Sequence, residues 1–128
     1  MKIQTLDHIA LIVKDIEASV KWYEDVIGLK KIYEGQWGGV PTFVVVKGTG
    51  TGLALFPATT DNPKAKPDGD YLVVDHFAFR VSGEDFEEAK KILPEKGIVI
   101  RIADHEIAKS IYMFDPDGYQ VELTTYDV

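Results

Sequence analysis

The sequence predicts an α+β protein made of two consecutive modules, each with the order strand, helix, strand, strand, strand. The first observation is a repeat: the stretch LDHIALIV at residues 6–13 returns as VDHFAFRV at residues 74–81, with Asp, His, Ala and the final Val identical. The second is its extent, because the shift of 68 between the two histidines also places Gly118 on Gly50. A repeat that aligns at both ends indicates a duplicated structure.

The first module is expected to span about residues 3–57. Asp15 stands where the N-cap of a helix belongs, and Gly28 provides the left-handed residue that ends such a helix. Between them, apolar side chains recur at helical spacing as far as Ile27. Alternating or β-branched apolar runs predict the four strands, at about residues 5–13, 29–35, 41–47 and 53–56.

The second module is expected at about residues 72–126, after a polar stretch at residues 57–70 that is either a connector or a lid over a pocket. Ser82 is the predicted N-cap of its helix, with Asp85 three residues later, and Gly97 follows its end. Strands are expected at about residues 72–81, 98–102, 109–114 and 119–126, with a tight Asp-Pro-Asp-Gly turn before the last one.

The composition narrows the class of protein. A chain of 128 residues is expected to form one domain, and its net charge of −7 argues against binding to nucleic acid or to an anionic membrane surface. No apolar run is long enough to cross a bilayer, and the N-terminus lacks the pattern of a signal peptide. With no cysteine in the chain, we expect a cytoplasmic protein without disulfides.

Three side chains suggest chemistry. Alternation places His8 and His76 on the same face of equivalent strands, so a pseudo-twofold relation would direct both imidazoles to one place. Glu122 lies in the middle of the last strand of the second module. A single strand histidine is more often a core residue, and a single glutamate more often faces solvent. Together, however, two imidazoles and a carboxylate predict a divalent-metal site with one side open to water or substrate.

The duplicated modules, the two Asp-His strands and the Asp-Pro-Asp-Gly turn before Glu122 resemble the vicinal oxygen chelate superfamily of glyoxalases, bleomycin resistance proteins and ring-cleaving extradiol dioxygenases. The resemblance covers essentially the whole chain. It implies a single glyoxalase-like domain over residues 1–128, with an open, cup-shaped mixed β-sheet and the helices outside. His8, His76 and Glu122 match the family's ligands for a divalent metal ion, which is Fe²⁺, Mn²⁺, Zn²⁺ or Ni²⁺.

Departures from individual family members bear on the reaction. Glyoxalase I and methylmalonyl-CoA epimerase place a fourth ligand where this chain has Ala54, and bleomycin-binding members usually lack the ligands. Fosfomycin-modifying members share the three-ligand pattern and a tyrosine at Tyr112, but have threonine in place of Ala10 and use an arginine in a C-terminal extension beyond Val128. Extradiol dioxygenases also share the ligands and the tyrosine; they are about twice as long, so the resemblance is to their catalytic half.

We therefore expect a divalent-metal-dependent enzyme that acts on a small substrate with vicinal oxygens, by extradiol-dioxygenase-like chemistry on a catechol with Fe²⁺ or Mn²⁺. The alternatives are a lyase or thiol transferase of the glyoxalase or fosfomycin-resistance type, and a non-catalytic module that binds an antibiotic or metabolite. Tyr112 is either a packing residue or a catalytic hydrogen-bond donor, and His105 is either an exposed loop residue or a proton shuttle. Trp37 and Tyr33 are candidates for the mouth of the cup. The resemblance also implies a homodimer, with modules paired within a chain or across chains.

Overall fold

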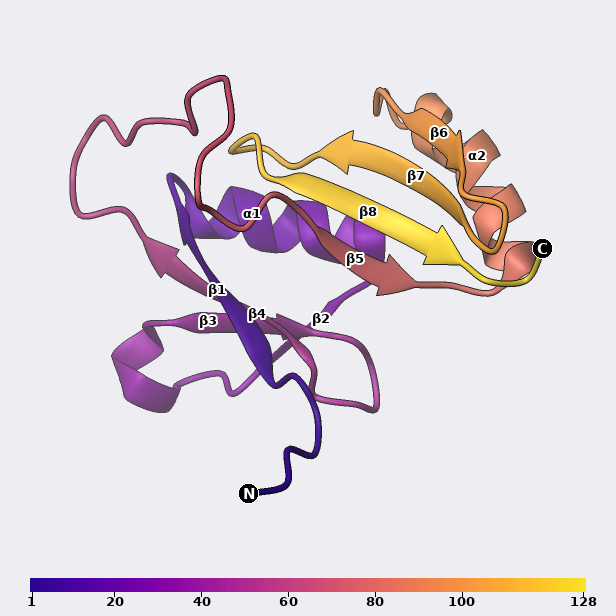
Figure 1. Ribbon diagram of the computed structural model, residues 1–128. Helices are drawn as coiled ribbons and strands as arrows, with labels where there is room; N and C mark the ends of the chain where they lie inside the picture. Colours follow the sequence, from indigo (N-terminus) through magenta and orange to yellow (C-terminus); the bar gives the residue numbers. More distant parts are fainter. The chain divides into compact units, whose positions relative to one another are not determined.

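The computed structural model describes all residues from Met1 to Val128 and divides into two compact units, Met1–Ala65 and Lys66–Val128. Both follow the predicted order of strand, helix and three strands, and each forms one mixed four-stranded sheet (Figure 1). The prediction of a duplicated α+β fold is confirmed.

In the first unit, the strand order is β1-β4-β3-β2, with β1 parallel to β4 and the other pairs antiparallel. The helix α1 continues without a break into a π-helical segment, η1, and a 3₁₀ turn, η2, precedes β3. The elements are β1 (His8–Val13), α1 (Ile16–Trp22), η1 (Tyr23–Ile27), β2 (Lys30–Ile32), η2 (Gln36–Gly39), β3 (Thr42–Val45) and β4 (Gly52–Pro57).

In the second unit, the strand order β5-β8-β7-β6 repeats the same pattern, with β5 parallel to β8. One helix, α2, packs against this sheet and contacts β8 (Figure 1). The elements are β5 (Phe77–Arg80), α2 (Gly83–Glu95), β6 (Arg101–Asp104), β7 (Lys109–Phe114) and β8 (Gln120–Thr125).

Both predicted N-caps are present. The Asp15 carboxylate accepts a hydrogen bond from the Ala18 backbone N–H at 3.1 Å, and the Ser82 hydroxyl accepts one from the Asp85 N–H at 3.1 Å. These bonds satisfy donors that the first turn of a helix leaves free. Gly28, at φ +81°, ends the first helical segment as expected.

The strands β1 and β5, at whose starts the histidines lie, begin later than the sequence predicts. We expected them from about residues 5 and 72, but they begin at His8 and Phe77. The reason is the length of their partners, because β4 starts at Gly52, opposite His8, and β8 starts at Gln120. Residues before Asp7 and before His76 have no strand to pair with. The strand expected at residues 98–102 likewise lies later, at Arg101–Asp104.

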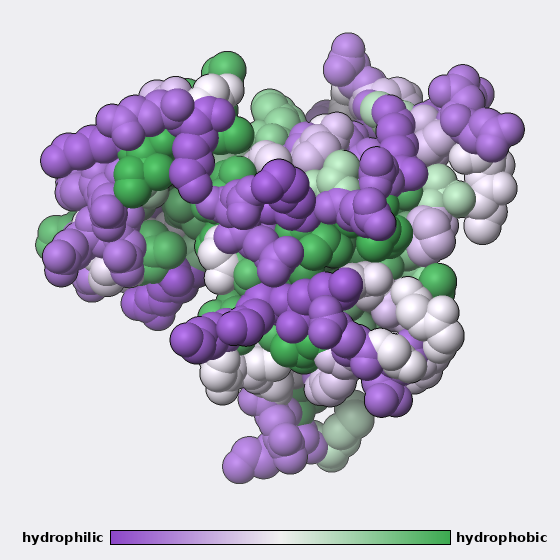
Figure 2. Space-filling view, turned by 180° about the vertical axis from the view of Figure 1, so that it is seen from behind, coloured by the Kyte–Doolittle hydropathy of each residue, from purple (hydrophilic) through white to green (hydrophobic).

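Alternation along the strands separates the buried face of each sheet from the face that carries the histidines. In β1, Leu11 and Val13 are buried while His8, Ala10 and Ile12 are exposed. Both units have their own buried apolar residues, and on the face shown in Figure 2 other hydrophobic residues reach the surface among hydrophilic ones. No helix has the length and apolar character needed to cross a membrane.

Candidate metal centre

The register of the second sheet brings a row of functional side chains to one face. Arg101 in β6 is directly opposite Tyr112 in β7, Tyr112 is opposite Glu122 in β8, and Glu122 is opposite Ala78 in β5. Directly opposed residues of neighbouring strands project to the same side of a sheet. A cation, a phenol and a carboxylate therefore share the face on which His76 is expected.

His76 and Glu122 form the centre of this group. The imidazole Nε2 lies 3.0 Å from Glu122 Oε2, and the other carboxylate oxygen accepts a hydrogen bond from the Ser110 hydroxyl. Glu122 is only 8% exposed, and Ser110 is fully buried. A buried carboxylate requires such partners, because an unpaired charge away from water is very costly. Glu122 thus faces the site and not bulk solvent.

The second nitrogen of His76 is held by an acidic neighbour. His76 Nδ1 lies 2.9 Å from Asp75 Oδ2, while the other Asp75 oxygen contacts Lys66 Nζ at 3.2 Å. The hydrogen bond with His76, followed by the contact with Lys66, lowers the pKa of the Asp75 carboxyl group. A carboxylate on Nδ1 orients the ring and leaves Nε2 for a ligand, as is common for metal-binding histidines.

The distance between His76 Nε2 and Glu122 Oε2 is suitable for two ligands of one divalent metal ion. With metal–nitrogen and metal–oxygen distances of about 2.0–2.2 Å, two ligands at roughly a right angle are about 3 Å apart. The separation of 3.0 Å between His76 Nε2 and Glu122 Oε2 is of this size. Imidazole with carboxylate also matches the donor preferences of Zn²⁺, Mn²⁺, Fe²⁺ and Ni²⁺.

The first unit repeats part of this arrangement around His8. Its Nδ1 lies 2.7 Å from Asp7 Oδ2, and its ring meets Phe43 edge to face at a centroid distance of 5.3 Å. In the second unit, His76 meets Tyr112 edge to face at 5.7 Å. The duplication therefore includes the Asp-His pair and its aromatic neighbour.

Sheet register shows where the two units differ. Phe43 is opposite Ala54, just as Tyr112 is opposite Glu122. The shift is 68 between Ala54 and Glu122, equal to the shift between the two histidines, but 69 between Phe43 and Tyr112. In the first unit, a methyl group thus stands in place of the carboxylate.

The structure brings together four of the five predicted site residues. His76, Glu122, Tyr112 and His105 all belong to the second unit, and His8 belongs to the first. Neither unit alone contains three or more His, Cys, Asp or Glu side chains grouped to hold a metal ion. The three-ligand set His8, His76 and Glu122 remains a prediction.

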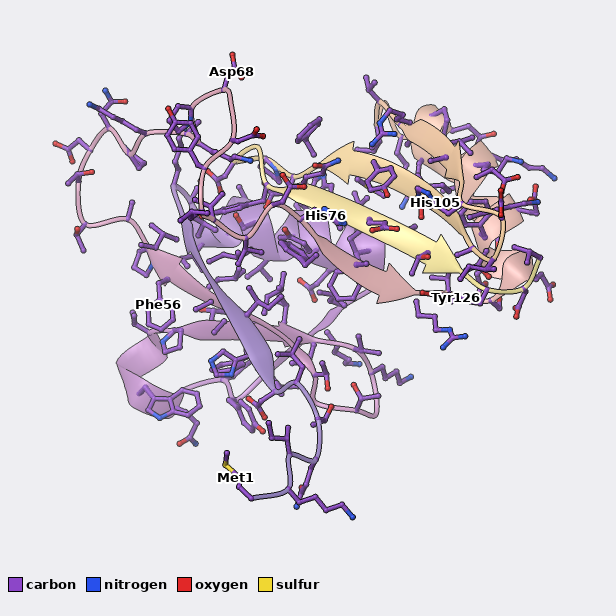
Figure 3. The ribbon with its side chains drawn as sticks, viewed as in Figure 1. Met1, Phe56, Asp68, His76, His105 and Tyr126 are labelled. Carbon is purple, nitrogen blue, oxygen red and sulfur yellow. The ribbon has the colours of Figure 1, made fainter.

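A second cluster surrounds the Tyr112 hydroxyl. His105 Nε2 lies 3.2 Å from the hydroxyl oxygen, and the Arg101 guanidinium stands 4.2 Å from the centre of the Tyr112 ring. Figure 3 labels His105, which follows β6, and His76, which precedes β5. The contact brings a proton acceptor or donor to the phenol, so the pair can relay a proton.

Sequence reasoning assigned no role to four neighbours of the site: Asp75, Lys66, Ser110 and Arg101. The repeated Asp before each histidine was visible as a pattern, and alternation places Ser110 on the face of Tyr112. Lys66 and Arg101 left no such signal, because their positions depend on loop conformation and on strand register.

The fold and the site together define the class of protein. The chain belongs to the Glyoxalase/Bleomycin resistance protein/Dioxygenase superfamily, whose family model matches residues 5–123. The resemblance inferred from the Asp-His repeat and the Asp-Pro-Asp-Gly turn is therefore confirmed.

Particular relatives are similar over nearly the whole chain. The metallothiol transferase FosB of Lysinibacillus sphaericus is 32% identical, over 98% of this chain and 84% of its own length. The glutathione transferase FosA of Serratia marcescens is 29% identical, over 94% of this chain and 80% of its own. Among solved structures, a glyoxalase/dioxygenase from Nostoc punctiforme matches with a TM-score of 0.80 and 25% identity, over 96% of this chain and 91% of that one.

Proposed function

We propose that this protein is a divalent-metal-dependent transferase that joins a thiol to a small substrate with neighbouring oxygen atoms, and that His8, His76 and Glu122 hold the metal ion. The observation that carries the proposal is the His76–Glu122 pair, 3.0 Å apart, with each partner's remaining polar atom already engaged. Such a pair offers one nitrogen and one oxygen to a cation without leaving another buried group unpaired.

The relatives favour the transferase over the dioxygenase that the sequence alone led us to expect. FosB is named a metallothiol transferase and FosA a glutathione transferase, and both align with nearly the whole chain. The thiol transferase was the alternative reading of the sequence, and it becomes the main proposal.

The chemistry requires few protein groups. A bound divalent ion supplies Lewis acidity to a substrate oxygen. The sulfur of the thiol forms a bond to an electrophilic carbon, the carbon–oxygen bond breaks, and the thiol proton ends on the released oxygen. Tyr112 can donate a hydrogen bond to an oxygen that gains negative charge, and His105, 3.2 Å from that hydroxyl, can exchange the proton.

Turnover with defined metals tests the proposal. Metal-free protein is loaded with Mn²⁺, Zn²⁺, Ni²⁺ or Fe²⁺, and mixed with small epoxides, fosfomycin among them, and with cysteine or glutathione. The expected product is a thioether, formed only with metal and lost in Glu122→Gln. Absence of any adduct with every combination would count against the transferase.

A dioxygenase is the second candidate, favoured by the His105–Tyr112 contact and by the family's name. Protein loaded with Fe²⁺ under anaerobic conditions and then exposed to O₂ with a panel of catechols would give ring-cleaved products. Protein that neither binds nor cleaves any catechol would eliminate this candidate.

A third candidate is a module that binds a small molecule without turnover. It differs from the enzyme in that its ligand binding does not depend on metal. If the protein purifies without stoichiometric metal, and the His8→Ala variant binds a ligand as well as the wild type does, sequestration replaces catalysis.

We also propose a homodimer, in which the two modules that form one site pair either within a chain or across chains. If they pair across chains, His8 comes from one subunit and His76 with Glu122 from the other. A mixture of His8→Ala and Glu122→Ala chains would then recover part of the activity. Pairing within one chain predicts no recovery.

A further inference from the structure

The first unit contains an aromatic pocket beside His8. Its volume is about 610 Å³, within the range of roughly 300–1,000 Å³ for small-molecule pockets. Its walls come from the end of the segment before β1, from the connection between β2 and β3, and from β3 itself. The lining residues are Asp7, His8, Tyr33, Gln36, Trp37 and Phe43.

Three of the lining rings contact one another. Tyr33 stands edge to face against Trp37, at 5.7 Å between centroids, and against Phe43, at 5.5 Å. Trp37 and Phe43 are also 5.5 Å apart. Phe43 is buried beneath the others, but Tyr33 is 55% exposed and Trp37 is 59% exposed. The cluster therefore has a buried base and two large rings that are open to solvent.

The packing of the rings favours a planar ligand stacked on them over a compact cation enclosed between them. Rings that enclose a cation stand apart to admit it, each within about 6 Å of the charge. These rings pack against one another, so a cation does not fit between them and the pocket lies on their outer side. The carboxylate in the pocket, Asp7, contacts His8 Nδ1 at 2.7 Å through one oxygen and lies beside the ring cluster, not between the rings. What remains is an aromatic surface suited to stacking.

The backbone provides an independent indication. Tyr33 and Trp37 have positive φ values of 57° and 51°, a left-handed conformation that bulky residues rarely adopt. The same connection contains three glycines with positive φ, a conformation that costs glycine little: Gly35, Gly38 and Gly39. Unfavourable conformations held in place are concentrated at binding sites. Here they hold both aromatic rings at the pocket.

We propose that the pocket formed by Tyr33, Trp37 and Phe43 binds a planar aromatic group of a small molecule by stacking. The inference rests on the proposed function only in assigning that group to the substrate or co-substrate of the neighbouring site. Stacking itself requires no metal ion, so metal-free protein can be used to test it.

The two tryptophans of the chain make a site-specific test available. Trp22→Phe leaves Trp37 as the only tryptophan, so its fluorescence reports on this pocket alone. Metal-free protein is titrated with 2-naphthalenemethanol, with its saturated decalin counterpart and with choline, by fluorescence and by calorimetry. We expect saturable binding of the aromatic alcohol, about three- to tenfold tighter than of the saturated one, and weaker binding of choline.

Variants locate the binding. Trp37→Ala and Tyr33→Ala should each weaken binding of the aromatic alcohol measured by calorimetry, whereas Trp37→Phe should retain most of it. Circular dichroism melting identifies any variant that fails to fold, in which case Trp37→Phe and wild type still decide the question against the saturated alcohol. Equal affinity for both alcohols, preference for choline, or a Trp37 signal that changes with protein concentration and not with ligand would overturn the proposal. Failure to observe thiol transfer would count against the proposed function, but it would not overturn this inference about the aromatic pocket.

Discussion

Replacing Glu122 by glutamine separates a metal ligand from a structural ion pair. Glutamine has the same shape, and its amide can still accept from Ser110 and donate to His76 Nε2. A bond to a charged group contributes about 1.5–3 kcal/mol and a neutral one about 0.5–1.5 kcal/mol, so metal-free protein should lose roughly 1 kcal/mol of unfolding free energy. That corresponds to a decrease in Tm of only about 4 °C.

The affinity of the Glu122→Gln variant for the metal ion should decrease much more than its stability does. Structural zinc sites bind with about 10–16 kcal/mol through four ligands, or roughly 3–4 kcal/mol for each ligand. Loss of the carboxylate should therefore weaken metal binding by about 100- to 1,000-fold. Competition with a chromogenic chelator measures the affinity, and melting with and without metal measures stability. Glu87→Gln, a carboxylate in the same unit paired with Lys90 on the surface of α2, is the matched control and should change neither affinity nor Tm appreciably.

One outcome would refute the reasoning. If Glu122→Gln binds metal within about threefold of the wild type but melts far lower, the carboxylate serves the fold and is not a ligand.

Three further predictions concern the same unit. Phe86→Ala should cost about 3–5 kcal/mol of unfolding free energy in denaturant titrations, because Phe86 is buried in the core, whereas Phe114→Ala, at an exposed position, should cost far less. Tyr112→Phe should reduce turnover by about 10²- to 10⁴-fold with unchanged metal affinity, since the ring stays and only the hydroxyl is lost; an equal loss of metal affinity would contradict this role. Lys66→Met should raise the pKa of the Asp75 carboxyl, followed by NMR, because Lys66 helps to keep it low; an unchanged pKa would show that His76 alone is responsible.

The duplicated architecture was predictable because its signals are local. Both N-caps, Asp15 and Ser82, and the alternation of β1 follow from neighbouring residues, and the structure confirms them. The predicted starts of β1 and β5 were too early. In each parallel pair, the paired region begins where the partner strand begins, and that partner lies more than forty positions away in the sequence.

In the site, too, some residues could be predicted from the sequence and others could not. His76 was found through the repeat and Glu122 as a carboxylate within an apolar strand, and the structure places the two in contact. Lys66 and Arg101 were missed because their contacts with Asp75 and Tyr112 depend on a loop conformation and on the register of β6 with β7, which no sequence period encodes. The identity of the reaction was less predictable still, since the same ligands support several chemistries on this fold.

Anomalous diffraction from crystals of the metal-loaded protein, measured at the absorption edge of the metal, tests the central claim most directly. We expect one strong peak per site, within about 2.0–2.3 Å of Nε2 of His8, Nε2 of His76 and a carboxylate oxygen of Glu122. A peak bound elsewhere, or one that contacts His76 and Glu122 while every His8 ring lies beyond bonding distance, would contradict the three-ligand site.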